Sequence, residues 1–159
     1  MALTIRPATS ADAELVHELI CALAAYEREP DAVQATAADL RAQLSSPHPP
    51  FECVIAEWDG VAAGMALFFP NYSTWRGRPG LYLEDLFVRP EHRGRGIGRE
   101  LLRHLARISE ARGYSRMEWA VLDWNEPTIA FYRRLGAVPM DQWTTFRLTG
   151  PALAALAAT

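Results

Sequence analysis

Residues 83–102 read LEDLFVRPEHRGRGIGRELL, and this stretch decides the fold. An apolar strand is expected to end at Arg89-Pro90, a basic glycine-rich loop follows over residues 93–98, and a helix begins at once. Glycines at a strand-to-helix turn let backbone N–H groups approach an anion closely, and the helix N-terminus adds a partial positive charge. The segment therefore predicts a site for a phosphate or pyrophosphate group.

The spacing of the glycines in this loop excludes two common phosphate-binding motifs. Gly94, Gly96 and Gly98 alternate with other residues, so the G-x-G-x-x-G dinucleotide fingerprint is not met. A Walker A loop is excluded because no Gly-Lys-Ser/Thr follows. The arginines that can reach a phosphate from this stretch, bidentately if required, are Arg93, Arg95 and Arg99.

Composition narrows the class of protein. A chain of 159 residues can form one domain with a sizeable core, and we expect a single domain over residues 1–159. Half of the residues are apolar, 22% are charged, and the net charge is −3. This acidic balance argues against a nucleic acid or an anionic membrane as partner and favours a cationic substrate.

The cysteines and the N-terminal region indicate an intracellular protein. Cys21 and Cys53 lack the spacing of metal ligands, so we expect reduced thiols in the core and no metal site. Residues 1–16 lack the layout of a signal peptide, and the apolar stretch 61–69 is too short to cross a bilayer. The expected location is the cytoplasm.

Periodicity along the chain predicts a mixed α/β domain. The expected strands cover residues 3–6, 51–58, 61–69, 81–88, 116–122 and 143–148. The expected helices cover residues 11–26, 37–44, 97–112 and 125–136, with a short tail helix over 151–158. Asp59-Gly60 between the second and third strands is a strong hairpin signal.

Two carboxylates interrupt the apolar strand over residues 81–88. Neighbouring strand residues point to opposite faces, so Glu84 and Asp85 are not expected to share a site. Burying either one is costly unless it is paired or hydrated. From the residues alone two readings stay open: one is an ion-pair partner while the other lies at a bulge, or Glu84 is a general base whose pKa burial raises.

A second motif lies downstream. Taken alone, Asn125 is a helix N-cap and Tyr132 a packing residue. Together with the glycine loop, however, the segment resembles the GNAT superfamily of acetyl-CoA-dependent N-acetyltransferases. Arg93, Gly96 and Gly98 match its Arg/Gln-x-x-Gly-x-Gly/Ala loop. The matching positions of its Asn…Phe-Tyr-x-x-x-Gly helix are Asn125, Phe131, Tyr132 and Gly136.

A closer resemblance, to the diamine (spermidine/spermine) N-acetyltransferase branch, covers almost the whole chain. That branch also contains thialysine acetyltransferases. The similar stretches are residues 5–9, 25–27, 81–85, 93–98 and 124–127. The resemblance implies a homodimer, in which residues 137–149 could exchange between subunits.

The resemblance implies the GNAT fold and its co-substrate. A mixed, mostly antiparallel sheet of six to seven strands would splay between the fourth and fifth strands, with about four helices around it. Acetyl-CoA would lie in the opening, held by main-chain groups of the fourth strand, by the pyrophosphate loop and by the second motif. The implied cofactor-binding residues are Leu86, Phe87, Val88, Arg93, Gly94, Arg95, Gly96, Ile97, Gly98, Arg99 and Asn125.

The resemblance also implies roles in catalysis. Glu84 would act as general base, through water, on a primary amine, and Tyr132 would protonate the departing thiolate of CoA. The implied substrate-binding residues are Tyr26, Glu27, Trp75, Glu84, Glu118 and Trp119. A solvated acidic loop remains the reading for Glu29 and Asp31.

The expected function is therefore acetyl transfer to a small polyamine, diamine or lysine-like substrate. Two alternatives stay open. One is a related enzyme that acetylates an aminoglycoside, an amino acid or a protein N-terminus, and the other is a CoA-binding regulator without catalysis.

Overall fold

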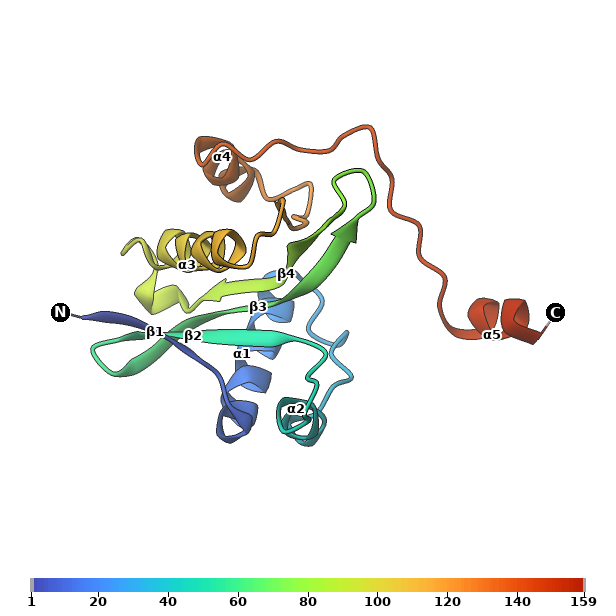
Figure 1. The fold of residues 1–159 in the computed structure, drawn as a ribbon. Coiled ribbons are helices and arrows are strands. Elements are labelled where there is room, and N and C mark those ends of the chain that lie inside the picture. Colours follow the sequence, from blue (N-terminus) through green and yellow to red (C-terminus); the bar gives the residue numbers. More distant parts are fainter. Residues whose placement is uncertain (1, 159) are drawn as a thin grey trace. The chain divides into compact units, whose positions relative to one another are not determined.

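The computed structural model describes residues 2–158. Contacts between residues divide the chain into two compact units, Met1–Ala120 and Val121–Thr159. The first unit contains the sheet and its covering helices, and the second contains the downstream motif. Figure 1 shows the two units by the colour of the chain, from blue to yellow and from orange to red.

The first unit is built on a five-stranded sheet in the order β1-β2-β3-β4-β5. The first three pairings are antiparallel, and β5 lies parallel to β4. The strands are β1 (Leu3–Pro7), β2 (Glu52–Trp58), β3 (Val61–Ser73), β4 (Arg78–Val88) and β5 (Met117–Glu118). The prediction of a mixed, mostly antiparallel sheet is confirmed, with five strands in place of six to seven.

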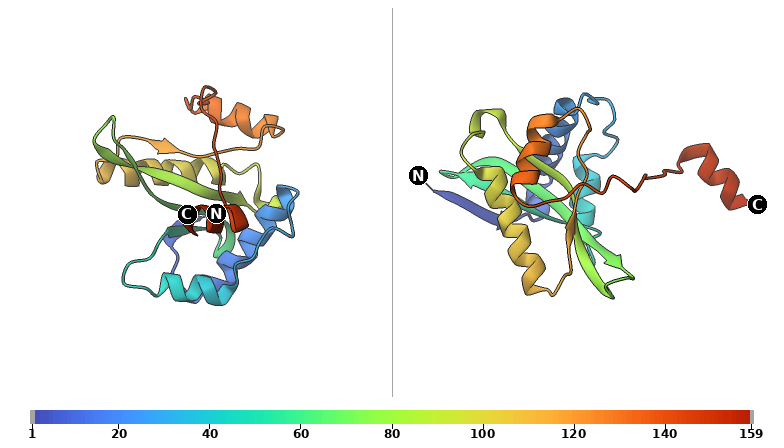
Figure 2. Two further views of the ribbon diagram at one scale, coloured as in Figure 1. Left: turned by 90° about the vertical axis from the view of Figure 1, so that its right-hand side faces the viewer. Right: turned by 90° about the horizontal axis from the view of Figure 1, so that it is seen from above.

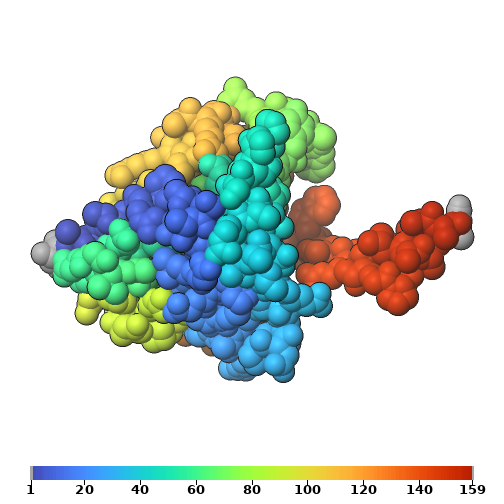
Figure 3. Space-filling view, turned by 90° about the horizontal axis from the view of Figure 1, so that it is seen from below, coloured from blue at the N-terminus to red at the C-terminus, as the bar shows by residue number. Residues whose placement is uncertain are grey.

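Helices cover both faces of this sheet. Figures 1 and 2 show α3 on one face and α1 with α2 on the other. The helices are α1 (Ala13–Tyr26), α2 (Ala37–Leu44) and α3 (Ile97–Ala111), with 3-10 turns η1 (Ser10–Asp12) and η2 (Pro90–His92). In the space-filling view from below, the blue and cyan surface of residues 10–50 covers much of the face of the first unit opposite α3 (Figure 3).

The main core lies between the sheet and α1. It combines apolar side chains that the helical and strand periodicities predict, and each buried leucine or isoleucine contributes about 1.5–3 kcal/mol. Its members include Val16, Leu19, Leu23, Cys53, Ile55, Met65, Leu67 and Phe87. The predicted core position of Cys53 is therefore confirmed, whereas Cys21 is only half-buried, with its sulfur 3.7 Å from His17 Nε2.

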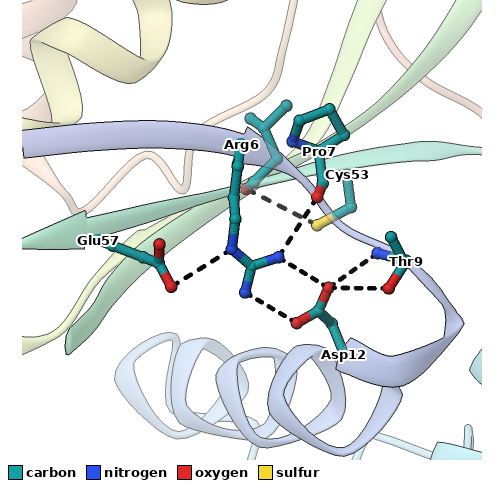
Figure 4. A network of polar contacts seen from close by, with 7 residues as sticks. Arg6, Pro7, Thr9, Asp12, Cys53 and Glu57 are labelled. Atoms are coloured by element: carbon teal, nitrogen blue, oxygen red, sulfur yellow. Dashed lines mark hydrogen bonds and ion pairs between the residues drawn. The ribbon is translucent and has the colours of Figure 1, made fainter. Parts of the chain in front are cut away.

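A polar network fixes the start of α1 to the edge of the sheet (Figure 4). Two guanidinium nitrogens of Arg6 each donate to an oxygen of Asp12 at 2.9 Å, and Arg6 Nε lies 3.3 Å from a Glu57 oxygen. Asp12 also accepts from the Thr9 backbone N–H at 2.8 Å. These contacts lower the pKa of Asp12, chiefly through Arg6, and hold α1 in one orientation against β1 and β2.

The second unit contains α4 (Glu126–Arg134) and α5 (Gly150–Ala158). The predicted helix after Asn125 is confirmed, and it ends before Gly136, which has φ of 94°. The predicted strand over residues 143–148 is wrong, because this segment forms no ladder with any described strand. Its large side chains remain exposed, with Trp143 at 67% and Phe146 at 91%.

Candidate active site

A bulge in β4 determines how the two consecutive carboxylates are displayed. Leu67 of β3 pairs with Asp85, but the next residue, Phe68, pairs with Leu83. Glu84 is therefore an extra residue in β4 with no opposite partner. A β-bulge of this kind bends the strand and changes which face the following side chains occupy.

The bulge brings both carboxylates to the face of the sheet that α1 covers. Tyr82 packs its ring 5.4 Å from that of Phe69, which borders the core under α1, and Glu84 follows two residues later. Phe87 belongs to the same core, although regular alternation from Tyr82 would place it on the other face. Asp85 is opposite Leu67, also of this core. The prediction that Glu84 and Asp85 point apart is therefore wrong.

Glu27 joins these two carboxylates from the end of α1. It occupies the C-cap position, and its backbone N–H bonds to Leu23 O. Burial raises the pKa of Glu27, and the charge of Glu84 raises it further. Burial likewise raises the pKa of Asp85 to about 6, with added repulsion from Glu84 and Glu27. Glu84 thus lies close enough to Glu27 and Asp85 to disfavour the charged forms of both.

Within the described part of the chain, no ion pair neutralises this group. In residues 2–158 none of the ion pairs includes Glu27, Glu84 or Asp85. Glu84 is exposed, so a ligand can reach it, while Asp85 is half-buried behind it. We call Glu27, Glu84 and Asp85 the acidic group below. Its chemistry suits a positively charged ligand such as an alkylammonium.

The remaining predicted substrate residues of the first unit lie around this group to different degrees. Glu118 is near Tyr82 and raises its pKa, after burial and Glu84. Glu118 is itself compensated, because it lies 3.2 Å from Arg116 Nε and accepts from Asn71 Nδ2 at 3.3 Å. Trp119 directly follows β5 and is half-buried. These positions leave Glu118 a weaker candidate for binding a cation than the acidic group.

Trp75 lies apart from the acidic group. It is 89% exposed and occupies the turn between β3 and β4. Six residues of β4 separate the start of that strand at Arg78 from Glu84, which corresponds to about 20 Å of extended chain. The structure therefore does not bring Trp75 and Glu84 together, and the role of Trp75 toward the substrate stays a prediction.

The pairing of β4 with β5 ends where the bulge begins. Only Leu81 with Met117 and Tyr82 with Glu118 are paired, so the predicted strand over residues 116–122 shortens to two residues. The bulge bends β4, so that its edge no longer matches the hydrogen-bonding positions of a straight strand in the place of β5. From Leu83 onward, the main chain of β4 pairs with β3 alone among the strands of the first unit.

The open part of β4 includes Leu86, Phe87 and Val88, the predicted main-chain ligands of the pantetheine arm. These residues lie opposite Ala66, Met65 and Gly64 of β3. A Cβ at Gly64 would lie 2.4 Å from Phe87 O, so only glycine permits this close approach of the strands. The packing of β3 thereby fixes the position of the β4 main chain.

The glycine-rich loop has the backbone geometry that its sequence predicts. Gly94 and Gly96 have φ of 77° and 78°, which L side chains rarely adopt, and Gly96 is the N-cap of α3. A Cβ at either position would meet no atom within 4 Å, so conformation rather than space requires glycine. The first N–H groups of α3 have no carbonyl partner within the helix and can bind an anion.

The arginines of this loop stack on aromatic rings. Arg93 donates from Nε to Val88 O at 3.0 Å, and its guanidinium lies 5.0 Å from the ring centre of Tyr26 and 5.6 Å from that of Phe87. Arg95 lies 5.0 Å from a ring centre of Trp58. Arg93 thus connects the loop to the end of α1. This contact was missed by the sequence reasoning, which assigned Arg93 only to phosphate.

Three other predicted cofactor residues keep α3 in place or extend from it. Ile97 is buried at the first position of α3. Gly98 approaches Val88 Cγ2, to which a Cβ would lie 3.9 Å away. Arg99 is exposed in the first turn. The loop residues therefore fit a pyrophosphate group, because main-chain donors, conformationally required glycines and exposed guanidinium groups lie within one short segment.

The predicted residues of the second unit lie on α4. Asn125 is the N-cap, and its carbonyl accepts from Ile129 N at 3.0 Å, while its side chain makes no capping bond. Tyr132 lies in the last turn with its ring 5.7 Å from that of Phe131. The carbonyl of Tyr132 accepts from Leu135 N and Ala137 N, which closes the end of the helix.

Two further features are absent from the described residues. No group of three or more His, Cys, Asp or Glu side chains between residues 2 and 158 is arranged to hold a metal ion. None of the helices in that range is long and apolar enough to cross a membrane.

Comparison with known proteins identifies the family. The model of the acetyltransferase (GNAT) family matches residues 14–137, a range that includes both the glycine-rich loop and α4. The chain belongs to the GNAT acetyltransferase family. It is accordingly an acetyltransferase, and the resemblance read from the two motifs is confirmed.

Individual relatives agree with this assignment. The chain is 36% identical over 164 residues to the thialysine N-epsilon-acetyltransferase of Bos taurus, with 96% of each chain covered. It is 35% identical over 153 residues to the human spermidine/spermine N(1)-acetyltransferase-like protein 1, covering 90% of this chain and 22% of that one. An integron cassette protein from the mobile metagenome of V. cholerae has a TM-score of 0.82 at 27% identity, with 100% and 99% covered.

Proposed function

We propose that this GNAT acetyltransferase moves the acetyl group of acetyl-CoA to a primary amine of a small polyamine, diamine or lysine-like substrate. The observation that carries the proposal is the acidic group. Its three carboxylates lie beside the open main chain of β4 and form no ion pair within residues 2–158. The names of the relatives, which refer to thialysine and to spermidine or spermine, support the same class of amine.

Acetyl-CoA is proposed to bind two segments of the first unit. The N–H groups of residues 94–99 at the start of α3 would hold the pyrophosphate, together with Arg93, Arg95 and Arg99. Main-chain groups of residues 86–88 would bind the pantetheine arm and polarise the acetyl carbonyl, since fixed N–H donors stabilise a developing oxyanion. Asn125, from the matched helix motif, would contact the pantetheine or its waters. The bound thioester supplies the activated acetyl group.

Glu84 is the proposed general base. An alkylammonium has a pKa of about 10.4, so at neutral pH it is almost entirely protonated and cannot attack a carbonyl. Glu84 is exposed on the bulge and can take this proton, directly or through a water molecule. For Tyr132 as the acid that protonates the departing thiolate, the support is its place in the matched motif.

Substrate selection would follow from the same charges. Glu27 at the end of α1 can pair with a second ammonium of a diamine, beside the ring of Tyr26, which is 40% exposed. Glu118 and Trp119, across β4 from this helix end, are proposed to line the pocket, and Trp75 to stack on a distal cation. A monoamine would lose these additional contacts and bind less tightly.

The decisive experiment measures the release of free CoA from acetyl-CoA in the presence of each amine of a panel. The panel contains spermidine, a short diamine, lysine, thialysine, an aminoglycoside and a peptide with a free N-terminus. The chain has no lysine, so acetylation of its own side-chain amines cannot add to the signal. Turnover of diamines or lysine-like amines is expected. Turnover confined to the aminoglycoside or the peptide would shift the acceptor class, and tight acetyl-CoA binding without turnover of any amine would favour a regulator.

The wider organisation is part of the proposal. We propose one functional domain over residues 1–159, located in the cytoplasm, that forms a homodimer through residues 137–149. The support for the dimer is that these residues form no strand and expose Trp143 and Phe146. Light scattering should give twice the chain mass, and serine at both positions should return the monomer.

A further inference from the structure

We propose that Asp85 receives the amine's proton from Glu84 and holds it while the acetyl group is transferred. The inference rests on the proposed amine acetylation and adds a second carboxylate to its proton path. Glu84 touches the amine or its water, whereas Asp85 acts through Glu84 and is a positioning residue.

The bulge provides an outer and an inner carboxylate on one face of the sheet. Glu84 is the extra residue and is exposed, and Asp85 follows it on the same face but is half-buried. Asp85, Leu67 and Cys53 lie side by side on three adjacent strands. Asp85 of β4 pairs with Leu67 of β3, and Leu67 pairs with Cys53 of β2. Leu67 and Cys53 are buried core residues, so Asp85 lies beside apolar side chains, whereas Glu84 is exposed to solvent.

The surroundings of Asp85 favour its protonated form. The groups that face it are Glu84 on its own strand, Glu27 from α1, and the Cys53 thiol from β2, whose own pKa is raised to about 12 by burial, Asp12 and Asp85. Arg93 is held nearby over Phe87 and Tyr26, but forms no ion pair with Asp85 among the described residues. Burial and repulsion from the other two carboxylates raise the pKa of Asp85 to about 6.

The proton balance of the step is complete without any further reactant. The ammonium N–H bond breaks and an O–H bond forms on Glu84, then on Asp85. The neutral amine forms its C–N bond to the acetyl carbon as the C–S bond breaks, and CoA leaves as the thiol. The acid, Tyr132, protonates the thiolate, and the second proton lost by the amine nitrogen replaces the proton that Tyr132 gave up. Asp85 then releases its proton to solvent. One proton is released per acetyl group transferred.

The test is the pH profile of kcat/KM for the amine, from pH 5 to 9, in the wild type and Asp85→Asn. In the wild type, kcat/KM should decrease at pH values below about 6. The Asp85→Asn variant should lack this decrease above pH 5. Its kcat at pH 7.5 should fall by about 10- to 100-fold, less than the loss of about 100- to 10,000-fold expected for a general base, because Glu84 remains. Its KM for acetyl-CoA should stay within twofold. Asp59→Asn, a matched change at an exposed position of the hairpin between β2 and β3, should behave as the wild type.

Several outcomes would overturn the inference. An Asp85→Asn profile that keeps the fall near pH 6, or a kcat within twofold of the wild type, removes Asp85 from the path. Loss of acetyl-CoA binding in parallel would indicate a structural role only. If Asp85→Asn does not fold, Asp85→Glu replaces it, and the expected result is a displaced limb with partial activity. Failure of the proposed function is distinct, because then the wild type itself acetylates no amine.

Discussion

The glycine-rich loop and two members of the acidic group, Glu84 and Asp85, lie at opposite ends of the same strand-to-helix segment, yet the two sites are specified in different ways. The loop is specified locally, since Gly94 and Gly96 need positive φ and α3 begins directly after them. The acidic group is specified by pairing across the sheet, since the Glu84 bulge exists only relative to β3. One site can be read from twenty residues, whereas the other needs the fold.

This contrast also separates what each site contributes to function. The loop offers main-chain donors and would bind a part of acetyl-CoA that does not react. The acidic group offers carboxylates of unequal burial and would act on the reacting amine. Changes in the loop should therefore alter binding of the co-substrate, and changes in the acidic group should alter the rate and its pH dependence.

The largest expected effect is that of Glu84→Gln. The amide keeps the size of the side chain but cannot accept the amine's proton, so kcat should fall by about 100- to 10,000-fold at pH 7.5. Steady-state CoA release measures this, and the dissociation constant of acetyl-CoA should be unchanged. Glu91→Gln, at an exposed position of η2, is the matched control and should change neither kcat nor the dissociation constant of acetyl-CoA. A kcat within tenfold of the wild type would contradict Glu84 as the base.

The next effect is on stability and follows from the raised pKa of Asp85. Its unfolded value is 3.8 and its folded value about 6, so folding favours the protonated form. That contribution is complete below about pH 4 and is lost as the pH rises through 6. The difference corresponds to at most about 3 kcal/mol at pH 8. Asp85→Asn should therefore be more stable than the wild type at pH 8, by about 1–3 kcal/mol.

Urea unfolding at pH 8 and pH 4 measures this effect. The gain from Asp85→Asn should vanish at pH 4, where the wild-type carboxyl is protonated in both states. Asp12→Asn gives the opposite sign, because Arg6 lowers the pKa of Asp12 and its stabilisation is lost as the pH falls through the folded pKa. A pH-independent gain from Asp85→Asn would show that packing, not charge, is responsible.

Sequence patterns predicted the features that depend on adjacent residues better than those that depend on pairing between distant strands. The hairpin at Asp59-Gly60, the helix ending before Gly136 and the glycine loop are all confirmed, since each depends on a few adjacent residues. The strand at residues 116–122 is shortened and that at 143–148 is absent. Both have suitable side chains, but a strand forms only where another strand offers hydrogen bonds.

The acidic group illustrates the same limit. Strict alternation separates Glu84 from Asp85, and only the one-residue offset between β3 and β4 reunites them. The signal was nevertheless present, because two adjacent carboxylates in an apolar strand are costly unless the strand is irregular there. The stacking of Arg93 on Tyr26 had no such signal, since the two residues are far apart in the sequence.

A smaller effect is expected for Gly96→Ala in the loop. Alanine at φ of 78° costs about 1–2 kcal/mol, so either the protein loses this stability or the loop changes shape. Acetyl-CoA should bind about 10-fold more weakly, as calorimetry would show. Gly77→Ala, at φ of 65° in the turn between β3 and β4, is strained in the same way but remote from the loop. Equal weakening by both variants would mean that general destabilisation is the cause.

The smallest effect concerns the two arginines that attach the loop to the rest of the first unit. Tyr26→Leu removes the ring under Arg93, and Trp58→Leu removes the ring under Arg95. A cation–π contact at a partly exposed site is worth about 0.5–1 kcal/mol, so each change should weaken acetyl-CoA binding by about two- to fivefold.

The amine distinguishes these two contacts. Tyr26 precedes Glu27 at the end of α1, so Tyr26→Leu should also raise KM for a diamine, by about two- to fivefold, whereas Trp58→Leu should not. A double-mutant cycle between Tyr26→Leu and Arg93→Met isolates the stacking energy from the ring's own contact with substrate. An additive cycle with an unchanged KM for the diamine would mean that the end of α1 and the loop act independently, and the acidic group would then be positioned by the bulge in β4 alone.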